Sequence, residues 1–267
     1  MKVAVFRKLF GLGLQDTFVY RWNFVLRSLF GIAPLFATVW LWKAVCENNN
    51  TLAGYSFQSI VSYFLGVLIV ENLASPTEDE WRIAAEIREG QISALLLKPV
   101  DYLAYRFTLF ASYRILYTLV TLPFVALIFW FLRAHVQWPS QPITWLFFTV
   151  ALIGSAAMQF LLAFCLALLA FWFLEVSTLI FLLYSFEYFL SGHVFPIDLL
   201  PAPLHAAVQL APFPYELFFP VQLLLERISA REIAFGFSMQ SIWILILFIV
   251  ARLLWHAGVR RYQATGA

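Results

Sequence analysis

The chain has 267 residues, of which 63% are hydrophobic and only 12% are charged, and its mean hydropathy is +0.83. A soluble domain has about 45–50% apolar and about 25% charged residues, so this composition excludes an ordinary soluble protein. The formal net charge of +2, with basic residues spaced between apolar runs, indicates no nucleic-acid partner. We therefore expect an all-α integral membrane protein whose surroundings are the lipid bilayer.

Six apolar segments are long enough to cross the hydrocarbon core of a bilayer, which takes about 20 helical residues. The fourth and fifth belong to one nearly continuous apolar run that is interrupted only at Glu175 and Glu187. A single helix of that length would be about twice as long as the bilayer is thick, so we expect two spans with a tight turn near Glu175. The predicted spans are 24–46, 55–73, 107–132, 143–170, 176–191 and 233–254.

The segment 1–23 precedes the first span and has an apolar stripe at mostly three- and four-residue steps, formed by Phe6, Leu9, Phe10, Leu14 and Phe18. This spacing is typical of an interfacial helix that lies along the inner membrane surface. A continuation of the first spanning helix below the membrane explains the pattern equally well.

Lysine and arginine residues lie mainly on one side of these spans. Most are found before the first span, in the loop 74–106 and in the tail 255–267. The positive-inside rule therefore places these three segments and both termini in the cytoplasm.

The loop 74–106 contains the most polar stretch of the chain. Thr77 and Glu80 have the spacing of a capping box, and Gly90 is a plausible end for the helix that follows. A second, apolar helix is expected to end before Pro99, because proline lacks the amide donor. A solvated connector is one interpretation, but a connector needs far fewer residues. We favour a docking element that a soluble partner grips.

The segment 192–232 is rich in proline and yet largely apolar. Such a sequence cannot form one spanning helix, so we expect short external re-entrant helices before the last span. An amphipathic loop on the outer surface is the alternative. The residues that mark the region are Gly192, Pro196, Pro201, Pro212 and Pro214.

Charges inside a membrane span are costly and usually functional, and among those in the predicted spans we single out Glu71, Arg114 and Glu187. Glu71 closes the second span and Arg114 lies about two turns into the third, so they are placed to form a structural ion pair. Glu187 lies near the outer end of the fifth span and is the candidate pathway residue.

The sequence contains no motif of a catalytic or metal centre. The patterns H-E-x-x-H, G-x-S-x-G and the phosphate loop G-x-x-x-x-G-K-[ST] are all missing. His193 and His205 lie in the proline-rich segment, where an interfacial role is expected for them. We therefore expect no catalytic residue, metal or cofactor in this chain.

Several diffuse motifs occur in an order that resembles the permease subunits of type-2 ABC exporters. Residues 87–92 form an Ile-Arg-Glu-Gly-Gln-Ile turn that leads into Leu95-Leu96-Leu97-Lys98-Pro99, and Ser191-Gly192 leads to Phe195-Pro196 and Leu200-Pro201. The opening, with Tyr20 to Phe24 and then Leu41-Trp42, is similar to an uncharacterised bacterial branch of that family.

The resemblance implies a permease of the bacterial plasma (inner) membrane that has no ATPase of its own. Two permeases, either copies of this chain or this chain and a sibling, would join two ABC ATPase subunits that hold ATP and Mg²⁺. The helix after the second span would be the coupling helix that docks on the ATPase. By position this role falls on Glu80, Trp81, Ile83, Glu86, Ile87, Arg88, Glu89, Gly90 and Gln91.

Two other functions stay open at this point. A secondary transporter often shows two similar halves, and we find no convincing repeat between 1–133 and 143–267. A membrane-embedded, lipid-modifying enzyme would have to use His193, Asp198, His205 or Glu187 as its acid and base.

Overall fold

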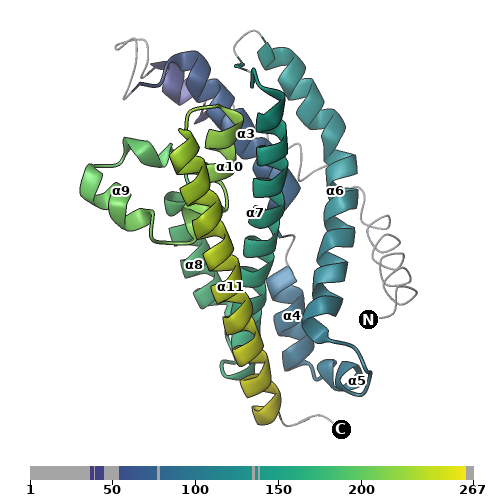
Figure 1. The fold of residues 1–267 in the computed structure, drawn as a ribbon. Helices are drawn as coiled ribbons and strands as arrows, with labels where there is room; N and C mark the ends of the chain where they lie inside the picture. The colour runs from purple at the N-terminus through teal and green to yellow at the C-terminus, as the bar shows by residue number, and fades with distance from the viewer. Residues whose placement is uncertain are drawn as a thin grey trace.

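The computed structural model describes residues 37–38, 40–44, 54–76, 79–133, 136–137 and 139–262. In these ranges the regular elements are helices (Figure 1), which confirms the predicted all-α membrane fold. The interfacial segment 1–23, most of the first span and Thr77 lie outside the described residues. The α-helices are α3 (Phe57–Ala74), α4 (Asp79–Arg88), α5 (Ile92–Leu96), α6 (Tyr102–Leu132), α7 (Pro142–Leu168), α8 (Ser177–Leu190), α9 (Ala202–Val208), α10 (Phe218–Leu224) and α11 (Ala230–Arg261).

Four helices of the described part are long and apolar enough to cross a membrane, and they contain α3, α6, α7 and α11. Helix α7 lies at the centre of the bundle (Figure 1) and contacts α3, α4, α10 and α11. In the 18-residue apolar stretch that qualifies each helix as a span, 72% of the residues of α7 are buried, compared with 17% for α6 and for α11. Ala151, Gly154 and Ser155 are small, buried residues that let neighbouring helices approach α7 closely. In a membrane the hydrophobic effect does not drive helices together, so close packing at small residues stabilises their contacts instead.

Side-chain caps fix where the long helices begin. Ser56 accepts a hydrogen bond from the amide of Ser59 at the start of α3, and Ser229 forms a capping box with Glu232 at the start of α11. At α6 the carboxylate of Asp101 accepts from the amide of Ala104 (2.8 Å). This cap starts α6 upstream of the predicted position 107, and the helix therefore includes Arg106.

Helix α8 ends within the bundle. It has 14 residues, and the chain turns at Gly192, whose φ of +92° suits glycine. The hydroxyl of Tyr63 donates to the carbonyl of Gly192 (2.5 Å), and the amide of Phe218 donates to the carbonyl of Ser191 (3.0 Å). Because Tyr63 lies about 9 Å along α3 from its first residue, the segment after α8 begins beside the second turn of α3 and not at its start.

The region 192–232 folds into short helices separated by prolines. Pro196 precedes a 3₁₀ turn at Ile197–Leu199, Pro201 caps α9, and Pro212 precedes another 3₁₀ turn, η4, at Phe213–Tyr215, which includes Pro214. Proline is tolerated at such positions because the first amides of a helix have no partner within it.

A polar network joins this proline-rich region to the start of α3. The hydroxyl of Tyr55 donates to the carboxylate of Asp198 (2.8 Å) and accepts from the amide group of Gln222 (2.6 Å). The guanidinium of Arg227 lies 3.8 Å from the centre of the Tyr55 ring, which is cation–π distance. Tyr55 is fully buried, so these contacts satisfy a hydroxyl that would otherwise be costly inside the protein.

The hydrogen bonds of Glu226 predict how the stability of the protein changes at acid pH. Its carboxylate accepts from the hydroxyls of Ser140 (2.7 Å) and Thr144 (2.8 Å) and from the amide of Gln141 (2.9 Å), and these donors lower its pKa to about 2. A lowered pKa means that the contacts stabilise the fold above the ordinary pKa of 4.5 and are lost as the pH falls towards 2. We expect Glu226→Gln to remove this pH-dependent part of the free energy of unfolding.

The measurement is thermal unfolding of the detergent-solubilised protein at about pH 6 and about pH 3. The wild type should lose more stability between these values than Glu226→Gln. Glutamine keeps the side-chain length at a position with a φ of +53°, so the variant isolates the charge. Equal losses in both proteins would contradict the prediction.

Candidate functional site

Helix α4, the predicted coupling helix, packs along the central helix α7. Ile83 and Ile87 are four residues apart on one side of α4 and are 0% and 4% exposed. Asp79 and Glu80, at the beginning of the helix, are buried as well. Three of the predicted coupling residues, Glu80, Ile83 and Ile87, therefore hold α4 on the bundle and do not face outward.

A buried polar cluster ties α4 to α6. Glu86 of α4 forms an ion pair with Arg106 and accepts a hydrogen bond from the hydroxyl of Tyr102 (2.8 Å). Arg106 in turn donates through Nε to the Tyr102 hydroxyl (3.1 Å), and the Tyr102 ring stacks on Trp255 of α11 at 4.5 Å between ring centres. Since Arg106 is 4% exposed, a displacement of α4 must move α6 or break a buried ion pair.

The surface open to a partner lies at the end of α4 that the sequence predicts to be cytoplasmic. Arg88, Glu89 and Gln91 are exposed there, and Trp81 is 37% exposed farther up the helix. Gly90 has a φ of +78°, which lets the chain turn sharply between α4 and α5. Arg88 donates to the carbonyl of Leu174 (3.3 Å) and Gln91 donates to Glu89 (2.7 Å).

The sequence did not single out the apolar part of this end of the molecule. Leu97 is 89% exposed and Leu96 is 41% exposed, just before the Lys98-Pro99 pair that ends α5. The apolar run before Pro99 was the one sequence signal for this exposed apolar surface, but a run of apolar residues does not show which side chains face outward. We call Arg88, Glu89, Gln91 and Leu97 the tip. It combines charged and apolar groups, as protein interfaces do.

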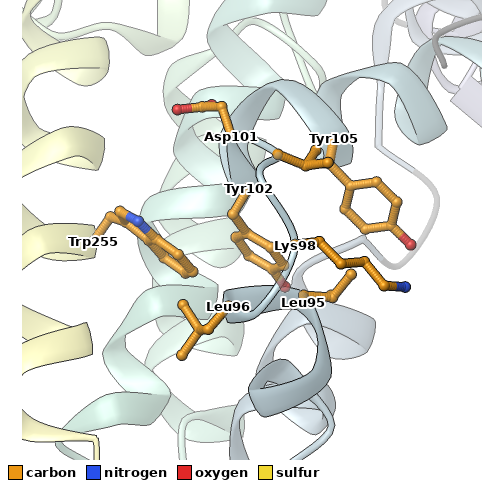
Figure 2. Close-up of a pocket in the computed structure, with 8 residues that line it drawn as sticks. Leu95, Leu96, Lys98, Asp101, Tyr102, Tyr105 and Trp255 are labelled. Carbon is orange, nitrogen blue, oxygen red and sulfur yellow. The ribbon is translucent and has the colours of Figure 1, made fainter. Parts of the chain in front are cut away.

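A hollow of about 200 Å³ lies beside the tip, between α5, the start of α6 and α11. Figure 2 shows Tyr102 between Trp255 on one side and Lys98 on the other. Burial acts to raise the pKa of Asp101 at its rim, but hydrogen bonds from Arg252 and from the amide of Ala104 hold it below its ordinary value. The hollow leaves α5 less tightly packed than α4. Helix α5 contacts the end of α11 through a hydrogen bond between the hydroxyls of Ser93 and Tyr262 (2.9 Å).

The structure changes the predicted pairing of Glu71 with Arg114. Arg114 is 7% exposed, and its guanidinium donates to the backbone carbonyl of Glu71, with the Tyr117 ring 5.0 Å away. The Glu71 carboxylate instead lies 3.6 Å from Nε2 of His193, after the end of α8. Arg114 thus holds the end of α3 as a backbone donor. The carboxylate of Glu71 still attracts Arg114 electrostatically, but its contact within salt-bridge distance is with His193.

Glu187, the candidate pathway residue, lies on α8. The charges of Glu71 on α3 and Glu80 on α4 act on it, and its side chain contacts that of Glu216. Glu216 follows η4 and is 0% exposed, and neither of its carboxylate oxygens receives a hydrogen bond from a described residue. The sequence signal for Glu216 was a lone acid within an apolar, proline-broken stretch.

In a comparison with protein families, the model of a family described as "ABC-2 family transporter protein" matches residues 32–266 of the chain. No curated protein matches. Among the described residues, no group of three or more His, Cys, Asp or Glu side chains is arranged to hold a metal ion.

Proposed function

The chain belongs to the ABC-2 family of transporter proteins, and from this membership we infer an ABC exporter permease that couples to separate ATPase subunits through the tip. The observation that carries the coupling role is the cluster of Glu86, Arg106 and Tyr102. It connects a helix with an exposed cytoplasmic end to two long membrane helices. A secondary transporter and a lipid-modifying enzyme have no comparable support.

The proposed mechanism follows from this connection. ATP would be held by the partner subunits and would draw them together. The partners would press on the tip, and α4 would carry α6 and α7 with it because buried contacts join the three helices. ATP binding drives the change only as far as it favours one arrangement of the permeases over the other.

We also infer a second permease, either the same chain or a sibling, beside α8. The only buried residue of this helix is Ile180, while Phe181, Phe186 and Phe189 are 70%, 62% and 55% exposed. Lipid or a second permease would cover such a face. As in the sequence-based orientation, both termini and the tip would lie in the cytoplasm of a bacterial cell.

The coupling role predicts a defect from charge reversal at the tip. Arg88→Glu should weaken binding of the ABC ATPase at least about tenfold, because it reverses a charge where the partner must approach. The measurement is co-purification of the permease with an ABC ATPase encoded beside its gene, together with transport-linked ATP hydrolysis.

Arg231→Glu is the matched control, since Arg231 is also an exposed arginine but lies in the first turn of α11, at the end of that helix opposite to the one that contacts α5. It should retain the ATPase as well as the wild type does. If the wild-type permease retains no ATPase, the proposed function fails. If Arg88→Glu and Arg231→Glu behave alike, the tip is not the docking surface.

A further inference from the structure

A second hollow, of about 150 Å³, lies between α9 and the bundle, and we call it the α9 hollow. Helix α9 stands out from the other helices (Figure 1), and the Tyr215 hydroxyl anchors its end by donating to the carbonyl of Gln209 (2.7 Å). The opposite wall comes from α10 and from the segment that leads into the first two turns of α11. Pockets for drug-sized ligands measure about 300–1,000 Å³, so the α9 hollow has room only for a small group.

A side chain that lines the α9 hollow carries a buried acceptor. Gln222 lines the hollow and is 2% exposed. The Tyr55 hydroxyl gives its proton to Asp198 (2.8 Å), so the side-chain nitrogen of Gln222 must be the group that donates to this hydroxyl (2.6 Å). The side-chain oxygen of Gln222 is left over and receives no hydrogen bond from a described residue. An acceptor without a donor is costly inside a protein, so the hollow favours a ligand with N–H or O–H groups.

Charges of both signs line the α9 hollow without neutralising each other. The acids are Asp198 and Glu232, and they accept hydrogen bonds from the uncharged groups of Tyr55 and Ser229. The cation is Arg227, which lies over the Tyr55 ring and donates to a backbone carbonyl (3.3 Å). Among the described residues, no carboxylate is within salt-bridge distance of Arg227. Walls of this kind suit a ligand with an ammonium for the acids and an anionic group for the arginine.

The α9 hollow lies at the depth where the predicted membrane span of α11 begins. Phe235 lines the hollow and belongs to the predicted span 233–254, whereas Glu232 precedes that span. Phe235 is exposed, as are Leu204 and Leu210 at the two ends of α9, so apolar surface borders the hollow. Lipid headgroups occupy this depth of a membrane. A membrane amphiphile can therefore place its polar head in the hollow and its tails along this apolar surface.

We propose that the α9 hollow binds the headgroup of a zwitterionic phospholipid with a primary ammonium, the chemistry of phosphatidylethanolamine. The ammonium would donate to Asp198, Glu232 and the oxygen of Gln222. The phosphate would accept from Arg227. A quaternary ammonium has no N–H to donate and is recognised by open ring faces, but the guanidinium already covers a face of the Tyr55 ring. An anionic headgroup without an amine would leave both acids unpaired. The proposal goes beyond the coupling role and does not depend on an ATPase.

The test titrates the purified full-length chain in detergent with dioctanoyl phosphatidylethanolamine and measures bound lipid by native mass spectrometry. Dioctanoyl phosphatidylcholine has the same charges but no N–H, and dioctanoyl phosphatidylglycerol has a phosphate but no amine. We expect the Kd for phosphatidylethanolamine to be at least about tenfold lower than for either of these lipids. Glycerophosphoethanolamine has the same head without tails, and it should bind at least about tenfold more weakly because it buries less apolar surface.

Two charge variants test the assignment to the α9 hollow. Arg227→Gln and Glu232→Gln should each raise the Kd for phosphatidylethanolamine about tenfold, the size of a lost charge contact. Glutamine at position 232 can still form the capping box with Ser229, so this variant removes the charge and keeps the start of α11. Arg231→Gln is the matched control, because Arg231 is exposed in the first turn of α11 and does not line the hollow. It should leave the Kd unchanged.

Three results would overturn the proposal. Equal binding of the three lipids would mean that the headgroup is not recognised. Equal binding of phosphatidylethanolamine and glycerophosphoethanolamine would mean that the ligand is a soluble molecule and not a lipid. If both charge variants bind the lipid as Arg231→Gln does, the lipid lies elsewhere on the protein.

Discussion

Replacing Arg106 with methionine is expected to cost the protein about 3–5 kcal/mol of stability, the usual effect of removing one partner of a buried ion pair. The substitution leaves the carboxylate of Glu86 without its cation and the hydroxyl of Tyr102 without a donor. Tyr102 is 5% exposed and the side chain of Glu86 is only 21% exposed, so water replaces little of the lost contacts. We expect α4 to separate from α6, and the expressed protein to unfold at a clearly lower temperature.

The measurement is thermal and denaturant unfolding in detergent, with Arg252→Met as the matched control. Arg252 also forms an ion pair, with Asp101, but both side chains are partly exposed (33% and 42%). A pair of this kind contributes at most about 1 kcal/mol. Adding Glu86→Gln to Arg106→Met should recover part of the loss, because it removes the uncompensated charge. The prediction fails if Arg106→Met costs no more than Arg252→Met.

Gly236→Ala is expected to destabilise the protein by about 1–3 kcal/mol, although it adds only one methyl group. A Cβ atom at position 236 would lie 2.1 Å from the ring of Phe219, far inside van der Waals contact. Phe219 is 5% exposed and packs edge to face on Phe237 at 5.1 Å, so its ring has little room to move. The added methyl must push α11 away from α10 and disturb the region that follows α8.

Ser238→Ala is a suitable comparison on the same helix. Ser238 is exposed, and its hydroxyl donates within the helix to the carbonyl of Ala234 (2.8 Å), so its loss should change stability little. Combining Gly236→Ala with Phe219→Leu should recover part of the stability, since the smaller side chain makes room. Unfolding curves that coincide for Gly236→Ala and the wild type would rule out the close contact.

Several features of the fold follow directly from local sequence. Ser56, Asp101 and Ser229 cap helices because each places a side-chain oxygen before amides that have no partner in the first turn. The spacing of Ile83 and Ile87 predicted an apolar side of the cytoplasmic helix, and this side is buried. Such features could be predicted because they depend on residues within one or two turns of each other.

The candidate sites depended on contacts between distant segments. Arg106 appeared in the sequence as one basic residue of a cytoplasmic loop, but the cap at Asp101 places it inside α6, within reach of Glu86. Glu216 lies 29 positions after Glu187, and no local pattern joins them. The chain turns at Gly192, and the amide of Phe218 bonds to the carbonyl of Ser191, which brings the segment with Glu216 back to the end of α8.

The sequence by itself determined that the chain is a helical membrane protein, because 63% hydrophobic residues in long runs leave the bilayer as their favourable environment. Its few charges marked the cytoplasmic loop as the place of greatest interest. Only the tertiary structure decided which of those charges face outward at the tip, which lock α4 to α6, and which acids meet inside the bundle. The physical reason is that the cost of a charge depends on its burial and its partner, and both are set by neighbours far away in the chain.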